Sequence, residues 1–364
     1  MKKHLSFHSL SLPLTPSHSM IFLLAAAMLL TSVGALAQNK IDKQGRRQGH
    51  WVRTDKDGSK IYEGTFVDGQ ETGTFTYYYH DGSVRIRNTY SQPGRVCSHE
   101  AFDEQGHLLA TGTYNQRNRD GLWKFFNEQG RLVKEASYKM GVKHGPHIIY
   151  TSKGDTAEVA NWADNHRHGR WWKRIGERGY ITATYVRGGI EGRLVEYDDN
   201  GLLIREGFYK DGFRHGACRY FEDRHLVVDE RWTHGTLADR RVHLLTPDTQ
   251  FVSIFDIACL APQGKAKVVV YLKDGTKKVS HESAETLYDR LGNETFAYAN
   301  RKSRILVAMN CVQGTSKDNE GRDILILEPQ PDFVIFPDED GLKMTRSHQY
   351  EEDSPLEQLI RGKE

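Results

Sequence analysis

"GLWKFFNEQGRLVKEASYKMGVKH", residues 121–144, is one complete copy of the unit from which most of this chain is built. It opens on a glycine and carries two glycine turns, Gln129-Gly130 and Met140-Gly141. Dipeptides of this kind, with Asn-Gly and Asp-Gly as the strongest examples, favour positive φ and tight hairpins. The runs between the turns are rich in Trp, Tyr, Phe, Val and Ile, which suits strands. One unit therefore predicts strand, turn, strand, turn.

The same register recurs in eight copies, and we call the first residue of each copy its anchor. The anchors are Gly49, Gly73, Cys97, Gly121, Gly145, Gly169, Gly192 and Gly216. Seven copies have 24 residues and one has 23. A fixed period repeated this often indicates a stacked architecture. We predict a mainly β fold, an elongated antiparallel sheet of eight hairpin repeats over residues 38–240, followed by a small α+β domain.

Aromatic residues recur at fixed places in the unit. Two residues after the anchor stand Trp51, Phe75, Trp123 and Trp171, and five residues after it stand Tyr78, Phe102, Phe126, Tyr150, Tyr197 and Phe221. Positions two and five differ by an odd number, so on a strand they point to opposite faces. A sheet with aromatics on both faces offers a long binding surface. The aromatics that we predict for it are Trp51, Tyr78, Trp123, Phe126, Trp171, Trp172, Tyr197 and Tyr220.

At this level of detail the unit resembles a known family. The pattern G-x-W-x-x-Y/F, D-x-x-G, G-x-Y-x-x-G-x-x-H-G is similar to the MORN repeat, and more closely to its bacterial variant, which occurs in exported proteins and in YwqK-type antitoxins. The resemblance covers about residues 41–239. It implies an elongated antiparallel sheet that serves as a binding or scaffolding surface, with no catalytic residues. The third copy departs from the pattern, because Cys97 and His99 replace the glycine and the aromatic and Pro93 interrupts the preceding turn. We expect a local bulge or a widened loop there.

Histidines raise the question of a metal site. His144, His168 and His215 occupy one repeat position, so successive copies lie about 9.5 Å apart, too far to share an ion through bonds of about 2.1 Å. His147 stands where other copies have Trp, so we expect it to pack. His166 and His168 project to one side and could hold a metal weakly. We predict no metal site and no cofactor.

The chain also lacks the sequence motifs of the common enzyme classes. It has no G-x-S-x-G elbow, no H-E-x-x-H, no P-loop and no dinucleotide fingerprint. The segment "VQGTSKDNEG", residues 312–321, has the composition of a solvated hairpin connection. We predict no catalytic residues.

The four cysteines separate into two pairs. Cys97 and Cys218 belong to copies five repeats apart, about 47 Å by strand spacing, whereas a disulfide needs Cα atoms within about 7 Å. Cys259 and Cys311 flank apolar, strand-like runs in the C-terminal part. An oxidising environment would permit a bond between them, and two buried free thiols are the alternative.

Residues 1–37 have the pattern of a secretory signal peptide. An apolar run, Ile21–Ala37, ends in an A-x-A site with cleavage expected between Ala37 and Gln38; an uncleaved N-terminal anchor is the alternative. We expect the mature protein in the periplasm or on the outer surface of a Gram-negative-type bacterium. The chain has 50 Lys and Arg against 48 Asp and Glu. This balance gives no electrostatic case for nucleic acid, and we expect no membrane association beyond the signal peptide.

Residues 241–364 leave the 24-residue register and read as a capping domain that would cover the open sheet end. We expect a hairpin in residues 268–279, a helix from Ser283 to Gly292 and strands in residues 304–312, 323–328 and 332–341. A short final helix is expected in residues 354–362.

The function we expect is that of an exported, non-enzymatic binding or scaffold protein, which presents the repeat sheet to a protein or a cell-envelope glycan. An antitoxin or immunity-type role, which neutralises a toxin, is the alternative that the family resemblance suggests. An enzyme with its site in the C-terminal domain is the third hypothesis.

Overall fold

The computed structural model describes residues 39–248, 250–292, 295–339 and 341–344. The fold is mainly β, and twenty strands belong to one long antiparallel sheet. The chain divides into two compact units, one of residues up to 118 with 128–130 and one of the remaining residues from 119 onward. The predicted signal peptide and the predicted helix in residues 354–362 lie outside the described residues. Within the described ranges, no helix is long and apolar enough to cross a membrane.

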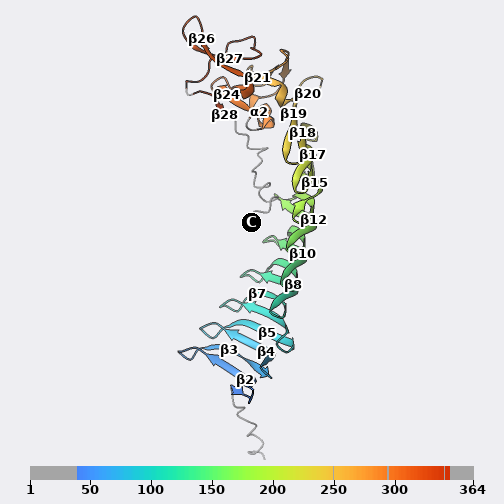
Figure 1. Ribbon diagram of the computed structural model, residues 1–364, viewed down its shortest axis with the longest axis vertical. Coiled ribbons are helices and arrows are strands. Elements are labelled where there is room, and N and C mark those ends of the chain that lie inside the picture. The colour runs from blue at the N-terminus through green and yellow to red at the C-terminus, as the bar shows by residue number, and fades with distance from the viewer. Residues whose placement is uncertain (1–38, 249, 293–294, 340, 345–364) are drawn as a thin grey trace, which may run out of the picture. The chain divides into compact units, whose positions relative to one another are not determined.

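The first unit is a meander in which each strand pairs antiparallel with the next. Its strands are β1 (Lys40–Ile41), β2 (Arg47–Thr54), β3 (Lys60–Val67), β4 (Gln70–Tyr78), β5 (Val84–Gln92), β6 (Val96–Phe102) and β7 (Leu108–Asn115). Figure 1 shows these strands in blue and cyan, side by side in chain order. The hairpin meander predicted from the repeats is confirmed here.

The second unit continues the same pattern. Its repeat strands are β8 (Asn118–Phe126), β9 (Leu132–Lys139), β10 (Val142–Tyr150), β11 (Thr156–Ala163), β12 (His166–Ile175), β13 (Gly179–Val186), β14 (Gly189–Ile190), β15 (Gly192–Tyr197), β16 (Leu203–Lys210), β17 (Phe213–Glu222), β18 (His225–Thr233), β19 (Thr236–Leu244) and β20 (Gln250–Ser253). The sheet therefore runs on past residue 240, where the 24-residue register ends.

Residues of positive φ set the hairpin turns. Asp68 and Gly69 have φ of 52° and 80°, as a two-residue hairpin that matches the strand twist requires. The turn between β7 and β8 has the same conformation without glycine, since Gln116 and Arg117 have φ of 49° and 64°. A search for glycine dipeptides misses this turn. A positive φ at non-glycine residues is uncommon, so the surrounding pairing must hold these two residues in place.

A ladder of rings covers one face of the sheet, which we call the ladder face. The ladder joins the ring two residues after the anchor to the aromatic residue near the end of the same copy's second strand. In the first unit the ring of Trp51 contacts Phe66 (5.9 Å between centroids), and Phe66 contacts Phe75 of the next copy (5.0 Å). At two ladder positions a small residue stands opposite a large one, as Gly64 pairs with Trp51 and Ala136 with Trp123. The rings can pack against one another across neighbouring strands because these partners leave room.

The opposite face carries the position-five aromatics. The Tyr78 hydroxyl donates to the Glu63 carboxylate, and in the second unit the Tyr150 hydroxyl donates to Glu135 at 2.9 Å. Glu63 and Glu135 each stand next to a residue of the ladder face, Gly64 and Ala136, and therefore on the other side of the sheet. The predicted division of positions two and five between the faces is confirmed for these copies.

The C-terminal part of the second unit is a small α+β fold. Its six-stranded sheet has the order β23-β22-β21-β25-β24-β28, and β26 and β27 form a separate hairpin. The elements are η1 (Ile254–Asp256), β21 (Ile257–Pro262), β22 (Val268–Leu272), β23 (Lys277–Ser280), α2 (Ala284–Leu291), β24 (Phe296–Asn300), β25 (Ile305–Ala308), η2 (Met309–Cys311), β26 (Val312–Lys317), β27 (Asp323–Leu327) and β28 (Lys343–Met344). The predicted hairpin in residues 268–279 is confirmed.

Two other expectations for this part have different outcomes. The helix is confirmed, because Ser283 caps α2 by accepting a bond from the Thr286 amide and Gly292 ends it at φ 81°. The strand expected in residues 332–341 is wrong, since only Ile335 forms a bridge, to Leu325. Pro331 and Pro337 flank that residue and have no amide hydrogen to extend the pairing.

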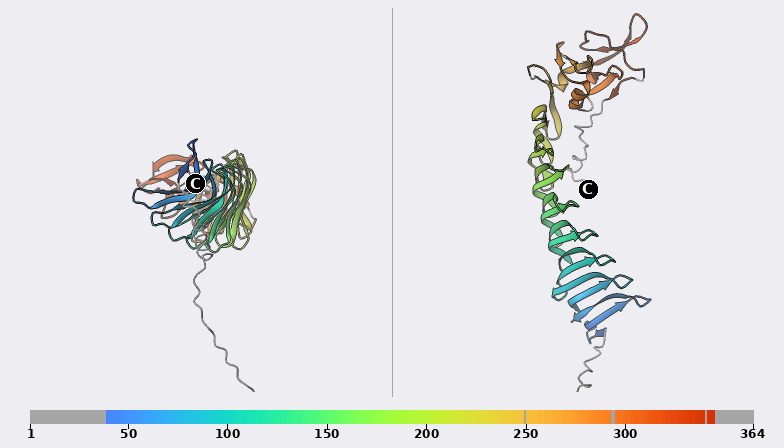
Figure 2. Two further views of the ribbon diagram at one scale, coloured as in Figure 1. Left: turned by 90° about the horizontal axis from the view of Figure 1, so that it is seen from below. Right: turned by 180° about the vertical axis from the view of Figure 1, so that it is seen from behind.

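The last repeats and the C-terminal part share one hydrophobic core. It contains Val228, Val242 and Leu244 from the repeat strands and Leu260, Leu287 and Phe296 from the C-terminal part. Figure 2 shows α2 and the C-terminal sheet in orange beside the last repeat strands. Arg290 of α2 reaches back to Glu222 of β17 at 2.8 Å and also binds Glu282 at 2.8 Å. The C-terminal part therefore covers this end of the repeat sheet, as the predicted cap would.

Candidate functional site

A cavity of about 290 Å³ lies in the first unit, where the first three repeats meet. It is lined by Glu71, Tyr77, Asn88, Tyr90, Gly94, Arg95, Cys97, Tyr114 and Arg117. The size is close to the lower end of the range for small-molecule sites, about 300–1,000 Å³. The cavity coincides with the departure of the third copy from the repeat pattern, which was the sequence signal for this site.

The local structure shows how that departure shapes the cavity. The turn from β5 to β6 is widened by Pro93, Gly94 and Arg95, and the strand register shifts between Tyr90 and Gln92. The expected widened loop is confirmed. Asn88 stands where the first, third and fourth copies have Gly64, Gly112 and Ala136, and its side-chain oxygen lies 2.8 Å from Nδ1 of His99. At this point of the ladder, the polar pair of Asn88 and His99 takes the place of a large aromatic ring and a glycine or alanine.

Three charged side chains line the cavity. Glu71 is half-buried, whereas Arg95 and Arg117 are exposed. In the described part of the chain, none of the three takes part in an ion pair. A carboxylate and two guanidinium groups are therefore available to a ligand.

Tyr77, Tyr90 and the Cys97 thiol each have a pKa above the ordinary value, so they are neutral polar groups at neutral pH. Burial raises the pKa of the Tyr77 hydroxyl, the nearby Glu71 carboxylate raises it further, and Arg117 opposes both effects. Burial also raises the pKa of the Cys97 thiol, which is 4% exposed. A protonated thiol is a poor nucleophile. The arrangement can bind a polar ligand, but it offers no activated nucleophile.

The structure corrects three of the predicted surface aromatics. Trp123, Trp171 and Tyr220 are 1%, 1% and 7% exposed, so they belong to the core rather than to a binding surface. Trp123 and Trp171 lie on the ladder face, where neighbouring rings and the guanidinium groups of Arg119 and Arg167 cover them. The other five are half-buried: Trp51, Tyr78, Phe126, Trp172 and Tyr197.

Two of these five meet on the face opposite the ladder. Tyr180 stacks on Trp172 with 6.2 Å between centroids and on Tyr197 with 4.9 Å, each pair at an interplanar angle of 29°. All three rings are half-buried. Tyr180 was not predicted as a surface aromatic from the sequence. This residue lies at the start of β13, at a place where the other copies have no regularly recurring aromatic residue. The trio is a second candidate contact surface.

Of the predicted histidines, His147 packs as expected. It is 6% exposed, lies between Tyr138 (5.6 Å) and Trp162 (5.4 Å), and approaches the Ser137 carbonyl at 3.1 Å through Nε2. His144, His166 and His168 are exposed. Burial lowers the pKa of His147, so it is neutral in the folded protein at neutral pH.

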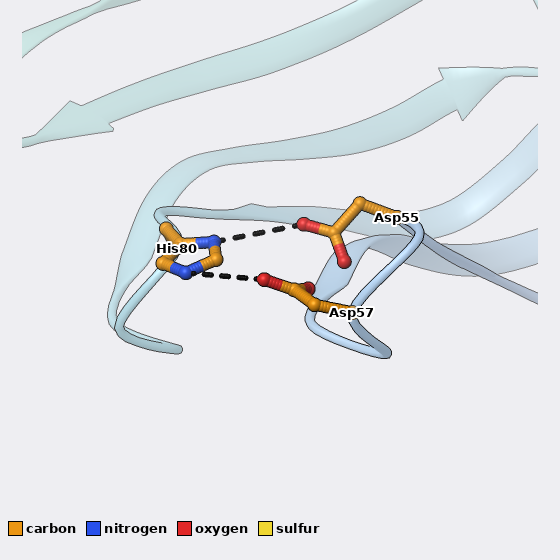
Figure 3. A group of neighbouring side chains, drawn as sticks. All are labelled: Asp55, Asp57 and His80. Atoms are coloured by element: carbon orange, nitrogen blue, oxygen red, sulfur yellow. Dashed lines mark ion pairs between the residues drawn. The ribbon is translucent and has the colours of Figure 1, made fainter.

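One group in the described residues has the composition of a metal site, namely Asp55, Asp57 and His80. Figure 3 shows the two carboxylates facing different ring nitrogens, with Nδ1 of His80 3.6 Å from Asp55 and Nε2 3.3 Å from Asp57. Hydrogen bonds with Asp55 and from the Ser59 amide, together with the charge of His80, lower the pKa of Asp57 to about 2. All three side chains are exposed on two neighbouring turns, and ion pairing alone accounts for their arrangement. Aligning the first turns of consecutive copies would have brought these residues together.

The cysteines are free thiols in this structure, and all four are buried. Cys259 and Cys311 belong to different hydrophobic clusters of the C-terminal part. The disulfide between them stays a prediction. Cys218 stands at position two, opposite Glu230, where it packs instead of a ring.

Comparisons with known proteins bear on the repeats. Residues 119–140 match the family described as MORN repeat variant. This match supports a MORN-repeat protein. The closer likeness of its MORN repeats to those of YwqK-type antitoxins stays a prediction. No curated protein matches the chain.

Among solved structures, the crystal structure of TcdB2-TccC3-TEV aligns with a TM-score of 0.19 and 9% identity, over 79% of this chain and 19% of that chain. The aligned region thus spans about a fifth of the chain in that structure. A TM-score this low carries no argument about fold or function.

Proposed function

We propose that this MORN-repeat protein is an exported, non-enzymatic binding or scaffold protein whose partner is a protein or a glycan of the cell envelope. The observation that carries the proposal is the cavity in the first unit. Its tyrosines, unpaired charges and protonated thiol make a polar recognition site without an activated nucleophile. The signal-peptide pattern of residues 1–37 is the basis for export, and it places the expected partner outside the cytoplasm.

The repeat architecture supports a binding role on physical grounds. A sheet of hairpin repeats presents side chains at a fixed spacing, so each copy can contribute to one extended contact surface. The stacked rings of Trp172, Tyr180 and Tyr197 add a half-buried aromatic surface in the second unit. Aromatic residues and Arg are enriched in the contact regions of protein interfaces.

The test is affinity capture from the envelope fraction with the full chain immobilised. Mass spectrometry identifies captured proteins, and monosaccharide analysis identifies captured glycans. We expect a partner that the wild type captures and that the Arg117→Ala variant captures at a level several-fold lower. Arg53→Ala is the matched control, because Arg53 is an exposed arginine of the same unit that does not line the cavity. Capture of no partner by the wild type would contradict the binding function. Equal capture by the three proteins would remove the cavity as its site.

A further inference from the structure

The ladder face has a recurring cation, which stands two residues before the anchor. We call this place the cap position. Five copies place a cation there over a ladder ring: Arg47 over Trp51 (4.9 Å to the centroid), Arg119 over Trp123 (4.8 Å), Lys143 over Trp162 (4.2 Å), Arg167 over Tyr185 (5.5 Å) and Arg214 over Trp232 (4.8 Å). Cations within about 6 Å of a ring are attracted by its quadrupole. The chain therefore supplies most of its ladder rings with its own cation.

The second copy reverses the charge at this position, since its cap residue is Glu71. Arg119 covers Phe125 (5.6 Å) and Tyr138 (5.5 Å) besides Trp123. By repeat register, the counterparts of Phe125 and Tyr138 beside Glu71 are Tyr77 and Tyr90. Both of these tyrosines line the cavity. In the described residues, no Lys or Arg lies over the ring of either one.

We infer that the cavity is a binding site for the cationic side chain of a protein partner, a lysine or an arginine. The incoming cation would take the place that Arg119 takes in its own copy. Its charge would lie beside the Glu71 carboxylate and the rings of Tyr77 and Tyr90. The inference rests on the proposed binding function and names the chemistry of its ligand.

The charges around the cavity are compatible with this ligand. Burial and the Glu71 carboxylate raise the pKa of the Tyr77 and Tyr90 hydroxyls, and Arg117 opposes this effect more weakly. Arg95 and Arg117 are exposed and would meet whatever flanks the bound side chain. Their unpaired guanidinium groups favour an acidic residue next to the basic one, since Arg pairs well with carboxylates. Complementary charge of this kind contributes to the specificity of interfaces.

The test measures binding of small probes to the full chain by saturation-transfer NMR. The probes are n-butylguanidinium and n-butylammonium chloride, with n-butylurea as the uncharged analogue and glucosamine to represent an amino sugar. We expect both alkyl cations to bind the wild type with millimolar dissociation constants, and n-butylurea to bind at least tenfold more weakly. A hydrogen bond to a charged group contributes about 1.5–3 kcal/mol, so Glu71→Gln should weaken binding of the cations by about tenfold or more.

Two variants complete the design. Glu71→Arg introduces the residue type of Arg47, Arg119, Arg167 and Arg214, and it should abolish binding because the internal guanidinium then fills the site. Glu104→Gln is the control, since Glu104 is an exposed glutamate in a turn of the same unit. Glu71→Gln keeps the volume of the side chain and removes only its charge. Its affinity for the cations therefore tests the role of Glu71 even if the Glu71→Arg variant does not fold.

Equal binding of n-butylurea, or unchanged affinity in Glu71→Gln, would overturn the inference. Glucosamine binding that depends on Glu71 and exceeds that of the alkyl cations would assign the site to a glycan instead. These outcomes are distinct from failure of the proposed function, because envelope capture can succeed through another surface while the probe titration fails.

Discussion

Replacing Gly64 with alanine tests whether the ladder needs a small residue opposite each ring. Gly64 lies in β3 opposite Trp51, and a Cβ added there would lie 2.5 Å from the ring carbons of Phe75. Carbon atoms in contact normally lie about 3.5–4.0 Å apart, so the ring or the strand must move by roughly 1 Å or more. Phe75 is 1% exposed, so its ring cannot move out into solvent without disturbing its neighbours.

The expected cost follows from that clash. Overpacking a core costs about 1–3 kcal/mol, and alanine returns up to about 1 kcal/mol by restricting the unfolded chain. The net range is about 0–3 kcal/mol, and because the contact is as close as 2.5 Å we expect Gly64→Ala to destabilise the first unit by about 1–2 kcal/mol. Urea denaturation followed by circular dichroism measures the loss, and hydrogen exchange of the β3 and β4 amides shows that the loss is local.

A comparator and a double-mutant cycle make this prediction specific. At Gly207 an added Cβ would lie 3.0 Å from Sγ of Cys218, a milder contact, so Gly207→Ala should cost less. Phe75→Leu removes the clashing ring. Its loss of unfolding free energy should therefore be smaller by at least about 1 kcal/mol in the Gly64→Ala background than in the wild type. A neutral Gly64→Ala, or equal effects of Phe75→Leu in the two backgrounds, would contradict a clash between the Gly64 position and the Phe75 ring.

Three further predictions concern the ion pairs, the thiols and the buried histidine. Arg290→Ala should lower the free energy of unfolding by about 3–5 kcal/mol, because it leaves the Glu282 carboxylate, which is 6% exposed, without its cation. Lys277→Ala breaks the exposed ion pair with Asp332 and should lower the free energy of unfolding by less than about 1 kcal/mol. Similar midpoints of urea denaturation for the two variants would contradict this difference. Burial raises the pKa of Cys218 to about 11 and of Cys259 to about 12, so iodoacetamide at pH 8 should label both slowly in the folded protein. After denaturation without reductant, mass spectrometry should find four labels if all thiols are free and two if Cys259 and Cys311 are bonded; rapid labelling of the folded protein would refute their burial. Because burial lowers the pKa of His147, the unfolded state binds more protons, and stability should fall as pH drops below about 6.5. His147→Phe should reduce the difference in unfolding free energy between pH 7 and pH 5, and an unchanged difference would contradict the assignment.

Much of the repeat fold could be predicted because each copy contains its own turn and strand signals. Asp68-Gly69 and its counterparts specify hairpins locally, and the anchor spacing aligns the strands. The turn at Gln116-Arg117 escaped prediction because neither residue favours positive φ by itself; pairing between strands imposes it. The isolated bridge of Ile335 escaped for a similar reason, since an apolar run forms a strand only where a partner edge is open to it.

The candidate site was predicted only in part. The departure at Cys97 and His99 marked the place, but the cavity depends on side chains from three copies that are up to 46 positions apart, from Glu71 to Arg117. The predicted surface aromatics failed for Trp123 and Trp171 for a related reason. A simple alternation of faces does not say which face is covered, and neighbouring rings and arginines cover the ladder face.

The repeated hairpins follow from the sequence alone, since a 24-residue period with paired turns leaves few other ways to satisfy backbone hydrogen bonds. The charge reversal at Glu71 is likewise visible once the copies are aligned. What that reversal produces depends on the folded structure. Burial, ring contacts and the absence of a cation over Tyr77 and Tyr90 within the described residues depend on distances between strands, and no single copy encodes those distances.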